Sequence, residues 1–107
     1  MTTFDKREEG FEKKLALDDE QKFRAHARRN RLLGQWAADK LGLTGPAVDE
    51  LIKSVQRADL EEAGDDDVFR KIRAEFDARG VEQSDHQIRR TMLDLLEQAM
   101  LEVKAAS

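Results

Sequence analysis

Three glycines, Gly42, Gly64 and Gly80, divide most of the chain into segments that each carry a helical pattern of apolar residues. Within the segments, apolar side chains recur three and four positions apart, and a glycine stands where each pattern ends. Strand signals are absent, because Val and Ile are scattered rather than alternating and no Asn-Gly or Asp-Gly pair joins two β-branched runs. The sequence therefore predicts an all-α protein.

The expected helices also have recognisable ends. The first runs over residues 18–41, and the second follows Thr44, a candidate N-cap, with Pro46 in its first turn, where the missing N–H costs nothing. Asp65 is the candidate cap of the third helix. Ser84 opens the last one with a capping box, in which two side chains satisfy backbone N–H groups reciprocally.

Each expected helix has an apolar face, and the last helix has the richest. The faces comprise Phe23, Ala27, Leu32, Leu33, Gly34, Trp36, Ala37 and Leu41; then Val48, Leu51, Ile52, Val55 and Leu60; then Val68, Phe69, Ile72 and Phe76; and finally Ile88, Met92, Leu93, Leu95, Leu96, Ala99, Met100 and Val103. Short connections favour antiparallel neighbours. We therefore expect a small four-helix bundle over residues 20–107, with the last helix at its centre, preceded by an arm of residues 1–19.

The composition excludes several classes of protein. The 107 residues include no cysteine, which rules out disulfides, thiol catalysis and thiolate metal sites. No apolar run approaches the roughly 20 residues of a membrane span, and no secretory signal is present, so we expect a soluble, intracellular protein that does not insert into membranes. The net charge of −4 argues against general nucleic-acid binding.

No catalytic group stands out from the sequence. His26 lies near the apolar face of the first expected helix and is interpreted as a packed histidine, whereas His86 is interpreted as a surface residue at a helix cap. The run Asp65–Asp67 lacks the alternate spacing, the glycine and the distal Glu of a calcium loop, and helix capping accounts for it. We expect neither an enzyme nor a resident metal or cofactor.

A basic stretch follows the arm. Lys22, Arg24, Arg28, Arg29 and Arg31 are spread around the expected helix, and no glycine-rich phosphate loop accompanies them, so a solvated face is favoured. Contacts with a nucleotide or with an acidic protein surface stay open for these residues and for Trp36. Arg29 with Asn30 lies closest to the apolar stripe, and this pair is also a candidate for a polar contact inside the bundle.

The arm carries only three apolar residues, Phe4, Phe11 and Leu15, at spacings that place them on one side of a helix. Burial of these side chains yields a few kcal/mol, at about 25 cal/mol per Å², against roughly 1 to 2 kcal/mol per residue for ordering the backbone. Gly10 adds a further penalty of about 0.5 to 1 kcal/mol in a helix interior. We therefore expect the free arm to be frayed, and to become a helix in the groove of a partner.

Four segments carry a resemblance to a known family. FDKREEGFEKK, FRAHARRNRLLGQWAADKLGLTG, ADLEEAGDDDVFRKIRAEFDARGV and SDHQIRR are similar to the zeta subunits of alphaproteobacterial F-type ATP synthases. The resemblance covers essentially the whole chain, and its most specific parts are ARRNRLLGQWAADKLGL and DLEEAGDDDVFRK.

The resemblance implies a four-helix fold and an inhibitor of ATP hydrolysis, a functional counterpart of the mitochondrial ATPase inhibitor protein. In the family, the N-terminal segment inserts between the alpha and beta subunits of the catalytic head, touches the central rotor (the gamma subunit) and blocks rotation in the hydrolytic direction. Carried over to this chain, the inhibitory segment is Thr2, Thr3, Phe4, Asp5, Lys6, Arg7, Glu8, Glu9, Gly10, Phe11, Glu12, Lys13, Lys14 and Leu15. Its expected anchors are Phe4, Arg7, Phe11, Lys14 and Leu15.

The resemblance places the protein in the cytoplasm, at the inner face of the plasma membrane through the synthase, and we expect it to be monomeric when free. Two alternatives remain at this point. The chain could be a regulatory helical module that binds ATP or ADP weakly, or a structural adaptor that uses the face around Trp36 without inhibiting.

Overall fold

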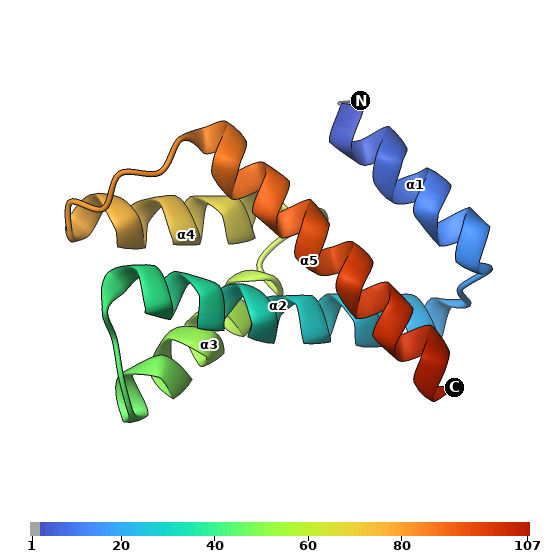
Figure 1. Ribbon diagram of the computed structural model, residues 1–107, viewed down its shortest axis with the longest axis horizontal. Helices are drawn as coiled ribbons and strands as arrows, with labels where there is room; N and C mark the ends of the chain where they lie inside the picture. Colours follow the sequence, from blue (N-terminus) through green and yellow to red (C-terminus); the bar gives the residue numbers. More distant parts are fainter. Residues whose placement is uncertain (1–2) are drawn as a thin grey trace.

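The computed structural model describes residues 3–107, with only the backbone of residue 3, and those residues form five α-helices and no strand (Figure 1). The helices are α1 (Thr3–Leu15), α2 (Asp19–Leu41), α3 (Pro46–Ala58), α4 (Asp66–Ala78) and α5 (Asp85–Ala106). The predicted all-α class is confirmed. None of these described helices has the length and apolar character that crossing a membrane requires.

The prediction of four helices with a frayed arm is wrong, because residues 3–15 form a fifth helix that packs along α5. The two helices run in the same direction, side by side (Figure 1). The energy comparison that predicted fraying treated the arm by itself. The groove beside α5 belongs to the same chain, so docking does not cost the translational freedom that binding a separate partner costs.

The capping box predicted at Ser84 and the helix end predicted at Gly42 are confirmed, and α2 has a further capping box at Asp18 that was not predicted. Asp18 and Ser84 each form a capping box, with Gln21 and Gln87 respectively, and Gly42 ends α2 in the left-handed conformation. Thr44 is not the cap of α3, however. Gly45 takes that place, with Pro46 as the first helical residue, because the φ of +62° at this position suits a residue without a Cβ.

The main core lies where α2, α3, α4 and α5 meet. Its fully buried side chains include Leu33, Val55, Ile72, Phe76 and Ile88. Both long helices are central, since α2 contacts α3, α4 and α5, while α5 contacts α1, α2 and α4. The last helix therefore shares with α2 the central position that was predicted for it alone.

A second apolar cluster lies at the other end of the two long helices. It consists of Leu17, Ala25, Leu96, Ala99, Met100 and Val103, with Phe11, Leu15 and Leu32 packed against it. Because Phe11 and Leu15 belong to α1, this cluster is what attaches α1 to the rest of the fold.

Three side chains assigned to apolar faces are exposed. Phe23 and Leu60 are 71% and 82% accessible, and Ala27 is exposed as well. The inward row at the start of α2 is Gln21, Ala25 and Arg29, so residues 23 and 27 point the opposite way. Leu60 has no helical neighbours to pack against because α3 ends at residue 58.

Candidate functional site

The candidate site is α1 together with the surface that it covers. Its inward face comprises Phe4, Glu8, Phe11, Glu12 and Leu15, all partly buried. The other residues of α1 are exposed: Lys6, Glu9, Gly10, Lys13 and Lys14 face outward, while Asp5 and Arg7 lie at the edges of the inward face. The expected anchors Phe4, Phe11 and Leu15 thus face the chain's own α5 and α2, whereas Lys14 faces away. Thr2 lies outside the described residues, and of Thr3 only the backbone is described.

Ion pairs at the edges supplement the apolar contact of α1. The Arg7 guanidinium donates two hydrogen bonds of 2.8 Å, from Nε and Nη2, to the Glu97 carboxylate on α5, and its Nη2 lies 3.5 Å from Asp94. Lys22 of α2 lies 3.7 Å from Glu12. Exposed pairs of this kind contribute little stability and are screened by salt, so they hold α1 in register rather than fixing it permanently.

The N-terminal half of α1 is packed more loosely than the C-terminal half. Phe4 meets the ring of His86 with centroids 5.6 Å apart, which identifies His86 as a contact of α1 as well as a residue near a cap. Behind Phe4 lies a cavity of about 720 Å³, with an apolar floor of Met92, Leu93 and Leu96 from α5. Four carboxylates also line it, those of residues 5, 8, 65 and 66. The side chains of this half of α1 therefore cover the cavity without filling it.

Glu8 is the most perturbed carboxyl group on α1. Burial, helped by the negative charges of Asp65, Glu12 and Asp5, raises its pKa to about 7, although the nearby Arg29 opposes the shift. His26, which faces it from α2, has a pKa below its usual value because burial and the charge of Arg29 disfavour the imidazolium. At neutral pH the Glu8 carboxyl is thus near its midpoint and the His26 imidazole is neutral.

Below α1, a buried polar network joins α2 to the connection between α3 and α4. Arg29 is fully buried; its Nε donates to Asn30 Oδ1 and its Nη2 to Asp65 Oδ1, both at 2.8 Å. Asn30 donates in turn to Asp59 at 2.8 Å. Burial tends to raise the pKa of Asp65, but the hydrogen bond and charge of Arg29 outweigh it and hold the pKa below its usual value. The network confirms the predicted internal contact of Arg29 with Asn30.

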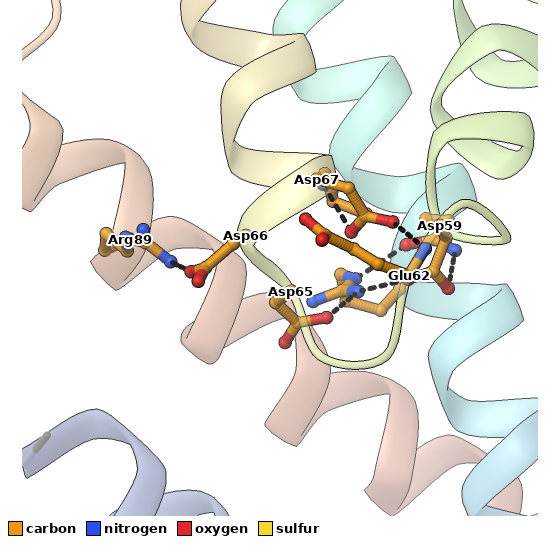
Figure 2. Close-up of polar contacts among 9 residues, drawn as sticks. Asp59, Glu62, Asp65, Asp66, Asp67 and Arg89 are labelled. Atoms are coloured by element: carbon orange, nitrogen blue, oxygen red, sulfur yellow. Dashed lines mark hydrogen bonds and ion pairs between the residues drawn. The ribbon is translucent and has the colours of Figure 1, made fainter. Parts of the chain in front are cut away.

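The three aspartates at the start of α4 have separate roles (Figure 2). Asp65 binds Arg29, whereas Asp66 pairs with Arg89 of α5 at 3.0 Å. Asp67 accepts hydrogen bonds from the backbone N–H groups of residues 62 and 68. Asp65 occupies the N-cap position but its side chain makes no capping bond, so only part of the capping interpretation holds. The three carboxylates do not converge on one point, which agrees with the structural interpretation of this run.

The comparison with known families decides the identity of the chain. The family model described as ATPase inhibitor subunit zeta matches residues 1–102. The chain belongs to this family. The match extends through α1 and nearly to the end of α5, so the docked helix is part of the shared sequence. No curated protein matches the chain significantly.

Membership of the zeta family supports an inhibitory role at the ATP synthase and association with that enzyme. It also supports a binding function rather than a catalytic one, since the family is one of inhibitor subunits.

The predicted docking residues lie on different parts of this zeta-family fold. Arg24 and Arg28 are exposed and pair with Glu20 and Glu102, while Arg31 is exposed near α3. Trp36 is half-buried and packs edge-to-face with Phe76, with the ring centroids 5.5 Å apart. Arg29 is inaccessible to any partner in this state because its side chain is fully buried, although its Nη1 has no hydrogen-bond partner among the described residues.

Sequence reasoning missed the convergence of Glu8, Glu12 and His26 beneath α1. Glu8 and Glu12 stand four residues apart among the apolar anchors of α1, so their position on the inward face could be read from the sequence. Their meeting with His26 could not, because it depends on how α1 docks.

Proposed function

We propose that this chain inhibits ATP hydrolysis by the F-type ATP synthase, and that α1 is the inhibitory segment. In this proposal α1 leaves α5 and inserts, as a helix, between an alpha and a beta subunit, where it contacts gamma and blocks rotation in the hydrolytic direction. The observation that carries the proposal is that α1 is complete as a helix yet is attached by half-buried side chains and exposed ion pairs. Its removal would leave the main core of α2 to α5 intact.

The energetics favour an exchange of partners. When α1 leaves its groove, Phe4, Phe11 and Leu15 lose the contacts that bury them partly in this chain. A cleft in the synthase that surrounds them more completely would bury a larger apolar area than the groove does. Affinity is then the difference between the two burials, reduced by whatever helical order is lost on release. A helix that is already formed while docked is closer to the bound conformation than a frayed arm would be.

The remaining helices supply the outer contact in this proposal. Arg24, Arg28 and Arg31 are exposed on one side of α2 and are suited to acidic surface at the mouth of the cleft, whereas Lys22 lies on the opposite side, next to Glu12 of α1. Trp36 is a candidate contact through its exposed part. The synthase would then hold the protein at the cytoplasmic face of the membrane.

A hydrolysis assay on purified synthase tests the proposal. The intact chain should inhibit, and a variant that lacks residues 1–15 should not. This deletion retains Leu17, which belongs to the second apolar cluster, and Asp18, which caps α2, so the rest of the fold is preserved. Equal inhibition by both proteins would refute the assignment of α1. Binding of the intact chain to the synthase with unchanged hydrolysis would instead support the adaptor alternative.

Release of α1 can be tested separately because the chain has no natural cysteine. Cysteines introduced by Arg7→Cys and Glu97→Cys face each other between α1 and α5, since the native side chains are in contact. A short cleavable cross-linker between them should abolish inhibition, and cleavage of the linker should restore it. Full inhibition by the cross-linked protein would show that α1 does not need to leave.

Nucleotide binding by the bundle stays a prediction without a supporting contact. The large cavity beneath α1 offers Arg89 and His86, but its four carboxylates oppose the negative charge of a phosphate chain. A nucleotide titration followed by NMR would test it, and shifts confined to residues around this cavity would favour it.

A further inference from the structure

Three side chains that can bind a metal ion converge between α1 and α2. Glu8 and Glu12 stand one helical turn apart on the inward face of α1, and His26 approaches them from α2. One carboxylate oxygen from each glutamate and one imidazole nitrogen lie within 4.8 Å of one another. All three residues are partly buried, so their positions are set by packing rather than by free rotation in solvent.

The three groups have little else to bind within the described part of the chain. Neither the Glu8 nor the His26 side chain makes a hydrogen bond or an ion pair with another residue in the range 4–107, and the Glu12 side chain has only its 3.7 Å contact with Lys22. Burying a carboxyl group without a partner is costly. A cation shared by the three groups would satisfy all of them.

The surroundings also favour a cation. An adjoining cavity of about 260 Å³ is lined by Glu8 and His26 together with Asp5, Asp59, Glu62, Asp65 and Asp66. The positive charges closest to this cavity are already paired, since Arg29 binds Asp65 and Arg89 binds Asp66. The cavity has room for water molecules that would complete a coordination shell.

We propose that Glu8, Glu12 and His26 form a site for one divalent transition-metal ion, and that Zn²⁺ fits it best. Imidazole nitrogen with carboxylate oxygens suits Zn²⁺ better than Mg²⁺ or Ca²⁺, which prefer oxygen ligands alone. Three protein ligands and a water make an ordinary tetrahedral zinc site, with neighbouring ligand atoms about 3.4 Å apart. The three ligand atoms, which lie within 4.8 Å of one another without an ion, would have to approach this spacing when the ion binds.

The bound ion would hold α1 against α2, because two of its ligands belong to one helix and the third to the other. By linkage, the ion stabilises whichever state assembles the site, which is the docked state. If α1 is the inhibitory segment, as proposed above, Zn²⁺ therefore keeps it away from the synthase. This regulatory consequence rests on the proposed function, whereas the metal site itself does not.

Metal binding is tested on the full chain with Zn²⁺ by calorimetry and with Co²⁺ by visible absorption. We expect one ion per chain, and Co²⁺ bands with the intensity of a four-coordinate site. Glu8→Gln and His26→Gln should each weaken Zn²⁺ binding at least ten-fold. The matched control is Glu9→Gln on the exposed face of α1, which should bind as the parent does. Absence of stoichiometric uptake, or equal binding by all these proteins, would overturn the site.

The clamping effect has its own measurements. Hydrogen exchange of the α1 amides should slow when Zn²⁺ is added to the parent chain, and should not change in Glu8→Gln. In the hydrolysis assay, Zn²⁺ should weaken inhibition by the parent relative to a zinc-selective chelator, with no difference for Glu8→Gln. Zinc uptake without slower exchange would refute the clamp. Slower exchange in a protein that fails to inhibit without metal would refute the proposed function and leave the site standing.

Discussion

Two arginines show that the bundle of α2 to α5 and the docked helix α1 are held in place by different kinds of contact. Arg29 is completely buried and binds Asn30 and Asp65 inside the fold, whereas Arg7 joins α1 to Glu97 at the surface. A buried guanidinium that loses its partners leaves charges stranded away from water, while an exposed one is simply solvated again. We therefore expect the bundle of α2 to α5 to unfold cooperatively, whereas α1 should detach from it reversibly.

Two glycines show that α2 and α3 are packed closely, whereas the exposed face of α1 is not. A Cβ on Gly34 of α2 would lie 2.8 Å from Ile52 Cγ1 and 3.0 Å from Ile52 Cα on α3, so these helices touch through their backbones. A Cβ on Gly10 of α1 would meet nothing within 4 Å. Close contact between α2 and α3 thus requires a glycine, and the exposed face of α1 does not.

The largest loss of stability is expected for the substitution Arg29→Ala. It removes the partner of Asp65 from a buried network, and we expect the free energy of unfolding to fall by about 3 to 5 kcal/mol. Urea denaturation followed by circular dichroism measures it. The control, Arg28→Ala, breaks an exposed pair with Glu102 and should change stability by less than about 1 kcal/mol. Similar losses for both variants would contradict the contrast.

The second largest loss of stability is expected for Gly34→Ala. The added methyl group pushes against Ile52, including its backbone, and we expect a loss of about 1 to 3 kcal/mol in unfolding free energy. Gly10→Ala is the matched control and should have the opposite sign, because alanine favours the helix by about 0.5 to 1 kcal/mol over glycine at an unobstructed site. Amide exchange in α1 measures the second effect. A stabilising Gly34→Ala would contradict the close contact.

Docking of α1 should depend on pH through Glu8. Its pKa is about 7 when docked and returns to the ordinary value near 4.5 when α1 is released, so the docked state binds more protons. The contribution of Glu8 to the stability of the docked state is therefore fully present below about pH 4.5, and it is lost as the pH rises through 7. His26, with its lowered pKa, acts in the opposite sense below pH 6.5.

Exchange of α1 amides between pH 6.5 and 8, corrected for intrinsic rates and measured with a chelator present, isolates the glutamate. Asp5, Glu12, Arg29 and Asp65 also face Glu8, whose own pKa of about 7 lies in this range. Opening should increase with pH in the parent chain and become flat in Glu8→Gln. An increase that persists in Glu8→Gln would assign the effect to another group.

The smallest effect on overall stability is expected for Arg7→Ala. The exposed pair with Glu97 contributes little to unfolding, so the denaturation midpoint should stay within error of the parent. The α1 amides, in contrast, should exchange faster, and inhibition should strengthen if Arg7 is not itself an anchor in the synthase. Weaker inhibition would show that Arg7 contributes more to the bound state than to the docked one.

The sequence by itself determined the local features of this protein. The capping box at Ser84, the stop at Gly42 and the helical spacing of apolar residues depend on neighbours within a few positions, so they could be read directly. The resemblance of the chain to zeta subunits also came from the sequence, and the family match supports it.

Only the tertiary structure decided whether the arm is free and which polar groups are buried. Docking of α1 depends on a groove built from residues near 25 and 96–103, and Asp65, the charged partner of Arg29, lies 36 residues away in the chain. The same holds for Glu8, Glu12 and His26, which meet only because α1 docks along α5 with its inward face near the start of α2. Such contacts are set by how complete helices pack, and helical periodicity shows which face is apolar without showing what covers it.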